Sequence, residues 1–180
     1  AAITRGDVTV QGLDSWMPQG DRRILRTLEA FGVAVETYSD QVRIHGGALR
    51  GRTVDIGDTP DLFPALAVLA SQSAGESRFV NGEHLRLKES DRIESTVAFL
   101  KAMGADVQGA RDGCVVRGPR PLREAFVDSH GDHRILMAAA VAGLVADGPV
   151  DITDPTCYRV SYPSFLEDFQ SLGAQFEVVS

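Results

Sequence analysis

Apolar and polar positions along the chain repeat in three successive units of similar design. Each unit contains a segment of helical periodicity that ends in an apolar residue, a glycine and a small apolar residue, and a β-rich stretch follows. Helices are predicted at 21–33, 91–105 and 164–174. Gly32, Gly104 and Gly173 recur about 70 residues apart, and glycine suits a helix C-cap because it tolerates a positive φ. The pattern therefore indicates an internal repeat.

Two further helices are predicted between these segments, at 62–74 and 135–146. Apolar residues surround both of them, so both should be buried. Short β-branched stretches predict strands at 8–10, 33–35, 41–44, 53–56, 78–80, 114–116, 125–127, 150–152 and 176–179. Strands that alternate with helices indicate the α/β class, and the repeat favours pseudo-symmetric units over a doubly wound sheet. The third unit stops after one helix and one strand, so we expect it to be incomplete or completed by another part of a longer chain.

Composition narrows the class of protein. The length of 180 residues fits a single domain, which is predicted over 1–180. The composition, with 43% hydrophobic and 24% charged residues, is typical of a globular protein. A formal net charge of -7 argues against a broad nucleic-acid surface, which needs an excess of Lys and Arg. No apolar run is long enough to span a membrane. Cys114 and Cys157 form no CxxC or metal-ligand spacing, so we expect reduced cysteines in a cytoplasmic protein.

Three predicted helices begin with an aspartate followed by cations. The sequences are Asp21-Arg22-Arg23, Asp91-Arg92 and Asp132-His133-Arg134. Each Asp suits an N-cap, but a cation in the first turn is disfavoured by about 0.3–1 kcal/mol because the helix dipole is positive there. Three such starts suggest that an anion binds nearby, since free N–H groups and guanidinium forks both favour anions. The alternative, arginines paired with their own Asp or solvated, is favoured for Arg22 and Arg23.

Two other groups of residues are candidates for chemistry. Lys88 and Glu89 lie in a predicted turn just before Arg92, so the three side chains can converge. A carboxylate between two cations stays ionised, but it can transfer protons once a substrate occupies the cations. The alternative is an exposed salt-bridged turn, which composition alone favours. Asp61 precedes the first apolar helix, where it either caps the helix or faces a substrate hydroxyl.

His133 begins the second apolar helix beside Arg134, a position that disfavours the charged imidazole. A neutral hydrogen-bonding or proton-shuttling group is therefore predicted, with a capping histidine as the alternative. His130 and His133 do not indicate a metal site, because no Cys or His lies at a supporting spacing.

These residues fall in segments that resemble a known family. Lys88-Glu89-Ser90-Asp91-Arg92 resembles the K-E-[ST]-D-R motif of EPSP synthases, and 131–138 resembles the family's D-H-R-x-x-M signature. Pro60-Asp61, 154–163 and 19–21 match in the same order. The likeness covers essentially the whole chain, and the two motifs distinguish this family from the UDP-N-acetylglucosamine enolpyruvyl transferases.

The resemblance implies a fold and a reaction. Each domain of the fold is an inside-out α/β barrel of βαβαββ units. Two such domains enclose the active site between them. The reaction joins phosphoenolpyruvate and shikimate 3-phosphate into 5-enolpyruvylshikimate 3-phosphate and phosphate, with no cofactor or metal. By the same resemblance Asp61 contacts the shikimate hydroxyls and takes the 5-hydroxyl proton, and Glu89 protonates the enol carbon. Lys88 lies close to both substrates, Arg92 and Arg134 hold phosphoenolpyruvate, and His133 supports them.

Two departures from the family pattern limit this assignment. Val160 stands where many relatives have a lysine, which puts one anion contact in doubt. The family's N-terminal segments, which hold the shikimate phosphate, are absent, so we expect an incomplete domain that needs a missing N-terminal domain for activity. Two alternatives remain open: an enzyme of the same fold that acts on a nucleotide sugar, and a catalytically silent anion-binding or interaction domain.

Overall fold

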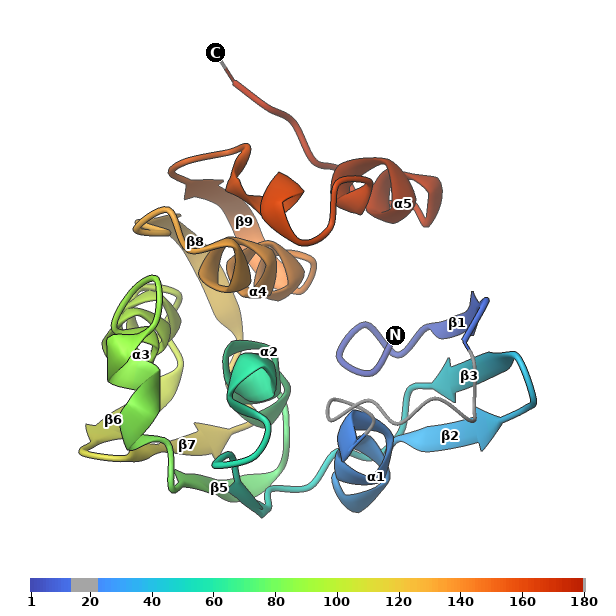
Figure 1. Ribbon diagram of the computed structural model, residues 1–180, viewed down its shortest axis with the longest axis horizontal. Coiled ribbons are helices and arrows are strands. Elements are labelled where there is room, and N and C mark those ends of the chain that lie inside the picture. The colour runs from blue at the N-terminus through green and yellow to red at the C-terminus, as the bar shows by residue number, and fades with distance from the viewer. Residues whose placement is uncertain (14–22, 180) are drawn as a thin grey trace.

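The computed structural model describes residues 1–13 and 23–179, and Asp21, Arg22 and the motif at 19–21 lie outside them. Three separate sheets, each associated with one or two helices, follow one another along the chain (Figure 1). The prediction of an α/β chain of repeated units is therefore confirmed.

The first unit contains a three-stranded antiparallel sheet with the order β1-β3-β2. Its strands are β1 (Asp7–Gln11), β2 (Ala34–Thr37) and β3 (Gln41–His45). Helix α1 (Arg23–Ala30) precedes β2, and its partly buried Ile24 and Leu28 pack against the main core.

The second unit contains a four-stranded mixed sheet with the order β4-β5-β7-β6. Parallel β4 (Thr53–Asp55) and β5 (Gly75–Val80) are linked through the 3₁₀ turn η2 (Pro60–Leu62) and helix α2 (Phe63–Ser71). The turn η3 (Glu83–Leu87) and helix α3 (Arg92–Ala102) then lead to the hairpin of β6 (Asp106–Ala110) and β7 (Gly113–Gly118). Antiparallel pairing of β7 with β5 completes this sheet.

The third unit repeats the first part of the second. Parallel β8 (Leu122–Val127) and β9 (Ala146–Ile152) are linked by helix α4 (His133–Gly143). The turn η4 (Cys157–Val160) and helix α5 (Phe165–Ser171) follow. Among the described residues, β9 has no strand on its second edge, whereas the equivalent β5 has β7 there. The prediction that the third unit is incomplete agrees with this topology.

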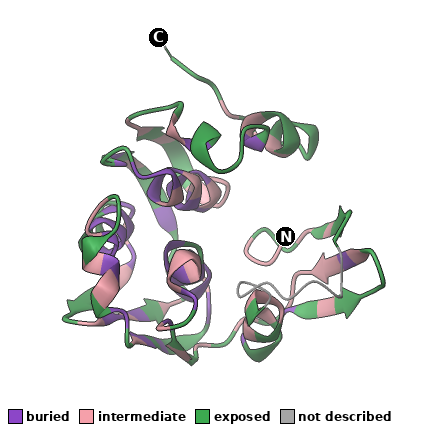
Figure 2. Cartoon of the chain, in the orientation of Figure 1, coloured by how far each residue is buried: buried purple, intermediate pink, exposed green. Residues whose placement is uncertain are grey.

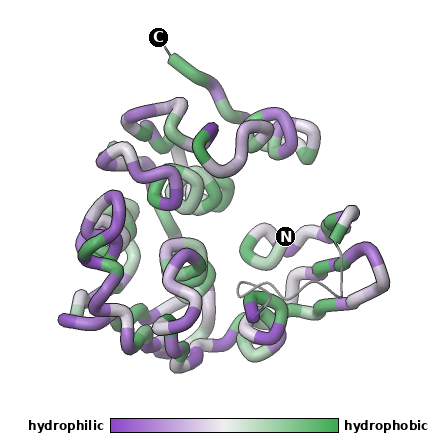
Figure 3. Tube along the Cα trace, viewed as in Figure 1, coloured by the Kyte–Doolittle hydropathy of each residue, from purple (hydrophilic) through white to green (hydrophobic). Residues whose placement is uncertain are grey.

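The core lies between the helices and the inner faces of the sheets. Helices α2, α3 and α4 pack against one another, and Figures 2 and 3 show buried, hydrophobic segments on their facing sides. The predicted burial of the two apolar helices is confirmed, since α2 buries every residue except Ala65 and α4 buries most of its length. A smaller core of Leu136, Ala140, Tyr158 and Phe165 joins α4 to η4 and α5. No helix among the described residues is long and apolar enough to cross a membrane.

Three helices end in the same way, as their glycines predict. Gly32, Gly104 and Gly173 have φ values of 93°, 89° and 94°. In each case the glycine N–H bonds the carbonyl three residues back, and the next residue's N–H bonds the carbonyl five residues back. This Schellman arrangement needs a left-handed residue, which glycine adopts without a Cβ clash.

The sequence prediction is wrong for one strand and missed another. Residues 174–179 form no strand, although their composition suits one. A strand needs a hydrogen-bonded neighbour, and none of the described residues pairs with this segment. Strand β6 was missed because Asp106-Val107-Gln108-Gly109 has only one β-branched residue, and its pairing with β7 determines its conformation instead.

Candidate active site

The first residues of three helical segments meet at one point. Asp61 lies in η2 just before α2, Arg92 is the first residue of α3, and Arg134 is the second residue of α4. The three segments belong to different parts of the chain, and the packing of α2, α3 and α4 brings their starts together. The resulting cluster of Asp61, Glu89, Arg92, Asp132 and Arg134 is called the arginine–carboxylate cluster below.

Two aspartates fix the helix starts as predicted. Asp91 caps α3, with its side chain accepting the backbone N–H of Glu94 at 3.0 Å. Asp132 caps α4 by accepting the N–H of Arg134 at 2.9 Å. Asp61 caps neither segment, because Thr59 and Leu62 hold the N-cap positions of η2 and α2. The interpretation of Asp61 as a helix cap is therefore wrong, and its carboxylate faces the arginines instead.

Arg92 is the centre of the cluster. Its side chain is 2% exposed, and it donates to three carboxylates. Nε lies 2.9 Å from Asp132 Oδ2, Nη1 lies 2.7 Å from Asp61 Oδ1, and Nη2 lies 2.6 Å from Glu89 Oε2. A guanidinium so enclosed is held in one orientation and joins the starts of α3 and α4.

Arg134 approaches the same point from the other side. Its Nη2 donates to Asp61 Oδ2 at 3.0 Å, so the two oxygens of Asp61 are divided between two guanidiniums. The Arg134 side chain remains 28% exposed. Its Nε atom is buried and has no hydrogen-bond partner among the described residues. A buried donor without a partner is costly, so this nitrogen has unused hydrogen-bonding capacity.

The ion pairs hold both partners in their charged forms. Burial opposes the charge of the Arg92 guanidinium, but the hydrogen bonds and charges of Asp132, Asp61 and Glu89 outweigh it and raise the pKa of Arg92. Burial likewise opposes ionisation of Asp132, but Arg92, the N–H of Arg134 and the Ser90 hydroxyl lower the pKa of Asp132. The interior of the cluster is therefore ionised at neutral pH.

The remaining predicted residues surround this centre. Glu89 is bonded to Arg92 and its side chain is 52% exposed, so it faces solvent at the edge of the cluster. Lys88 is exposed and forms no ion pair with the described residues, so the predicted convergence holds for Glu89 and Arg92 alone. His133 is the first residue of α4 and 7% exposed, and its imidazole makes no hydrogen bond within the described part of the chain. Arg23 pairs with exposed Asp58 at 2.6 Å and makes no ion pair with the cluster residues in the described part of the chain.

Sequence reasoning missed two sets of supporting residues. The Ser90 hydroxyl donates to Asp132 Oδ2 at 2.9 Å and so connects the turn before α3 with the cap of α4. Asp154 accepts from Ser129 Oγ and Gly131 N, each at 3.0 Å, which fixes the loop before Asp132. In this loop His130 and Gly131 have φ values of 52° and 68°. Short polar residues near a motif can indicate such supporting positions in a sequence. Their presence does not identify the residues with which they form hydrogen bonds.

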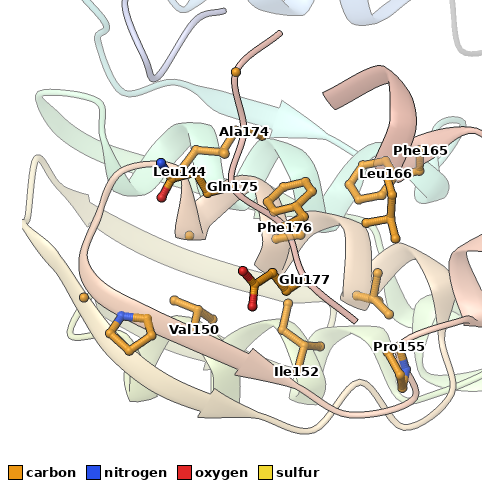
Figure 4. A pocket seen from close by; sticks show the side chains of 16 residues that line it. Leu144, Val150, Ile152, Pro155, Phe165, Leu166, Ala174, Gln175, Phe176 and Glu177 are labelled. Atoms are coloured by element: carbon orange, nitrogen blue, oxygen red, sulfur yellow. The ribbon is translucent and has the colours of Figure 1, made fainter. Parts of the chain in front are cut away.

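A separate groove lies on the other side of α4. It has a volume of about 630 Å³ and is lined by α4, β9, the start of α5 and residues 173–177. Figure 4 shows the apolar side chains of Val150, Ile152, Phe165, Leu166 and Phe176 around it. None of the six predicted site residues lines this groove. Within residues 1–13 and 23–179, no group of three or more His, Cys, Asp or Glu side chains is placed to hold a metal ion.

Comparisons with known sequences agree on one family. The sequence model of the family described as EPSP synthase (3-phosphoshikimate 1-carboxyvinyltransferase) matches residues 1–169. The chain is 51% identical over 174 residues to the 3-phosphoshikimate 1-carboxyvinyltransferase of Methanocorpusculum labreanum, covering 97% of this chain and 41% of that protein. It is 37% identical over 177 residues to the protein of the same name from Methanocaldococcus jannaschii, covering 98% of this chain and 41% of that protein. The chain thus spans 41% of the length of these two relatives.

Solved structures show the same fold. A structure of EPSP synthase from Acinetobacter baumannii superimposes with a TM-score of 0.87 and 30% identity, covering 100% of this chain and 45% of that one. The enolpyruvyl transferase NikO from Streptomyces tendae gives a TM-score of 0.71 with 22% identity and 94% of this chain covered, which shows the shared fold alone.

Proposed function

Because the chain belongs to the EPSP synthase family, we propose that it supplies the phosphoenolpyruvate side of an active site that transfers an enolpyruvyl group to shikimate 3-phosphate. The products are 5-enolpyruvylshikimate 3-phosphate and phosphate. The observation that carries this proposal is the position of Asp61, whose carboxylate lies between Arg92 and Arg134 at the starts of two helices. A base and two cations at one point are what this reaction requires of a protein.

Each of the six predicted site residues has a role in this proposal. Arg134 binds and orients phosphoenolpyruvate, Arg92 joins it when one of its carboxylate partners moves aside, and exposed Lys88 lies near both substrates. Asp61 takes the proton of the 5-hydroxyl of shikimate 3-phosphate. The hydroxyl oxygen then bonds to the central carbon of phosphoenolpyruvate. Glu89 donates a proton to the methylene carbon and takes one back when phosphate leaves, which restores the double bond. His133, at the start of α4, supports the arginines.

The arrangement favours some of these roles more than others. Glu89 is half exposed beside the guanidinium of Arg92, so its protons can exchange with solvent between turnovers. Arg134 keeps a buried Nε without a partner in the described chain, so it has donor capacity for an anion. Arg92 is already bonded to three carboxylates, so we propose that it mainly orients Glu89 and Asp61 and contacts substrate only when one of them moves.

We also propose that the active enzyme needs the remainder of a longer protein. The chain covers 41% of the length of the two relatives compared above, and the resemblance implies that the segments that bind the shikimate phosphate lie outside it. In the third unit, the second edge of β9 has no partner strand among the described residues, and β9 also lines the groove formed with α4, the start of α5 and residues 173–177. A segment from the rest of the protein would cover both features and place the missing domain over the cluster.

The test is an activity assay on two forms of the protein. The longer protein should release phosphate from shikimate 3-phosphate and phosphoenolpyruvate and form the enolpyruvyl product, identified by mass spectrometry. The 180-residue chain alone should show no measurable turnover, even at far higher protein concentration. If the longer protein bound both substrates but produced nothing, the chain would be a catalytically silent anion-binding domain of the same fold. Turnover by the 180-residue chain would refute the need for the missing part.

A further inference from the structure

The carboxylate of Asp61 occupies the two arginines that the proposed function assigns to an anionic substrate. Oδ1 accepts from Arg92 at 2.7 Å and Oδ2 accepts from Arg134 at 3.0 Å. One carboxylate thus bridges two guanidiniums in the way that a substrate carboxylate or phosphate would. The side chain of Asp61 is 35% exposed, so this bridge lies at the surface of the cluster, where an anion would enter.

The charges of the cluster disfavour a further anion. Asp61, Glu89 and Asp132 place three carboxylates around two guanidiniums, which leaves one net negative charge. Asp132 is completely buried, caps α4 and is held by Ser90, so it cannot leave without disrupting the helix start. Asp61 makes no cap and is partly exposed. Glu89 is more exposed but contacts Arg92 alone, so Asp61 is the one movable carboxylate whose departure frees both guanidiniums.

We propose that Asp61 is a built-in competitor for the anion site, and that a compact phosphate or carboxylate binds to Arg92 and Arg134 only as Asp61 leaves them. The proposal rests on the proposed function for the identity of the anion, but the competition itself requires no turnover. Once displaced, Asp61 is free to accept a hydroxyl proton. Anion binding and exposure of the base are then coupled, and the coupling acts in both directions.

The experiment measures binding of inorganic phosphate to the 180-residue chain at neutral pH and constant ionic strength. The Nε–Hε signal of Arg134 in nitrogen–proton NMR spectra reports occupancy. Asp61→Asn keeps the shape of the side chain but removes the competing charge, and it should tighten phosphate binding about tenfold, the change that 1.4 kcal/mol gives. Asp58→Asn is the matched control, because it removes the same charge from an exposed residue three positions away. Its affinity should stay within about twofold of the unchanged chain.

A second measurement avoids the variants altogether and covers the case in which Asp61→Asn does not fold. In the unchanged chain, with aspartate carboxyl carbons labelled, saturating phosphate should shift the Asp61 carboxyl signal and leave that of Asp58 in place. The proposal is overturned if Asp61→Asn binds phosphate no more tightly than Asp58→Asn, or if phosphate saturates Arg134 without moving the Asp61 signal. Neither result depends on enolpyruvyl transfer, so failure of this inference is distinguishable from failure of the proposed function.

Discussion

Arg92 and Asp132 form an ion pair that is almost completely withheld from water. Arg92 Nε lies 2.9 Å from Asp132 Oδ2, and the two side chains are 2% and 0% exposed. A buried pair adds little net stability when intact, but loss of Asp132 would remove the one fully buried carboxylate from Arg92 and leave it with the more exposed Asp61 and Glu89. Because this pair joins the starts of α3 and α4, its loss should disturb both the fold and the site.

Asp132→Asn should therefore destabilise the chain by about 1.5–3 kcal/mol at pH 7, the usual cost of a lost charge-assisted hydrogen bond, because Arg92 keeps Asp61 and Glu89 as partners. Chemical denaturation monitored by circular dichroism measures this free energy of unfolding. Asp147→Asn, an exposed substitution in β9, should change it by less than about 0.5 kcal/mol. Equal effects of the two substitutions would show that the buried pair has no special weight.

The difference in free energy of unfolding between the unchanged chain and Asp132→Asn should also depend on pH. Arg92 and the bonds to Arg134 N and Ser90 outweigh burial and lower the pKa of Asp132 below its ordinary value of 3.8. A lowered pKa contributes stability that is fully present above about pH 4 and is lost as the pH falls through the folded value. The difference between the unchanged chain and Asp132→Asn should thus be constant from pH 7 to about pH 5 and shrink below pH 4. A difference that grew on acidification would contradict the assignment.

The open edge of β9 should make the 180-residue chain self-associate. An unpaired strand edge is a site for pairing with another chain, and β9 also lines a groove that contains several apolar side chains. Sedimentation velocity over a series of concentrations should show dimers or larger species, and the longer protein, in which we propose that this edge is covered, should show fewer. A monomer at high concentration would mean that the edge is protected without any partner.

The helices could be predicted from the sequence because their signals are local. Gly104 closes α3 and Asp91 opens it through hydrogen bonds to residues three to five positions away. The prediction of a strand at 176–179 is wrong because strand formation depends on distant residues rather than on local signals. The segment's alternating residues favour a strand, but strand formation depends on a neighbour that the described chain does not provide.

The cluster could be predicted only in part. Helix-start signals identified Arg92 and Arg134 as unusual, position in the sequence made Asp61 and Glu89 candidates, and the family resemblance supplied their roles. The bridge from Asp61 to Arg92 and Arg134 spans 31 and 73 residues, and such partners follow from tertiary packing rather than from spacing. The burial of Arg92 was not foreseen either, since an arginine at a helix start is usually solvated.

Glu89→Gln in the longer protein should lower kcat about 100-fold or more while changing KM little, because the glutamine cannot transfer a proton. Steady-state kinetics with both substrates measures the two constants. Glu94→Gln is the matched control, since Glu94 lies in the same helix start but is exposed and outside the cluster. A large rise in KM with kcat unchanged would assign Glu89 to binding instead.

The most direct test of the central claim is the phosphoenolpyruvate KM of Arg134→Ala in the longer protein. The claim is that the starts of α3 and α4 form the phosphoenolpyruvate site, with Arg134 as its available cation. We predict that this KM rises about 10–100-fold, as expected for the loss of charge-assisted hydrogen bonds, while the affinity for shikimate 3-phosphate changes little. Arg23→Ala, which removes an exposed arginine paired with Asp58, should leave both values unchanged. An unchanged phosphoenolpyruvate KM in Arg134→Ala would contradict the account and leave Arg134 with a structural role only.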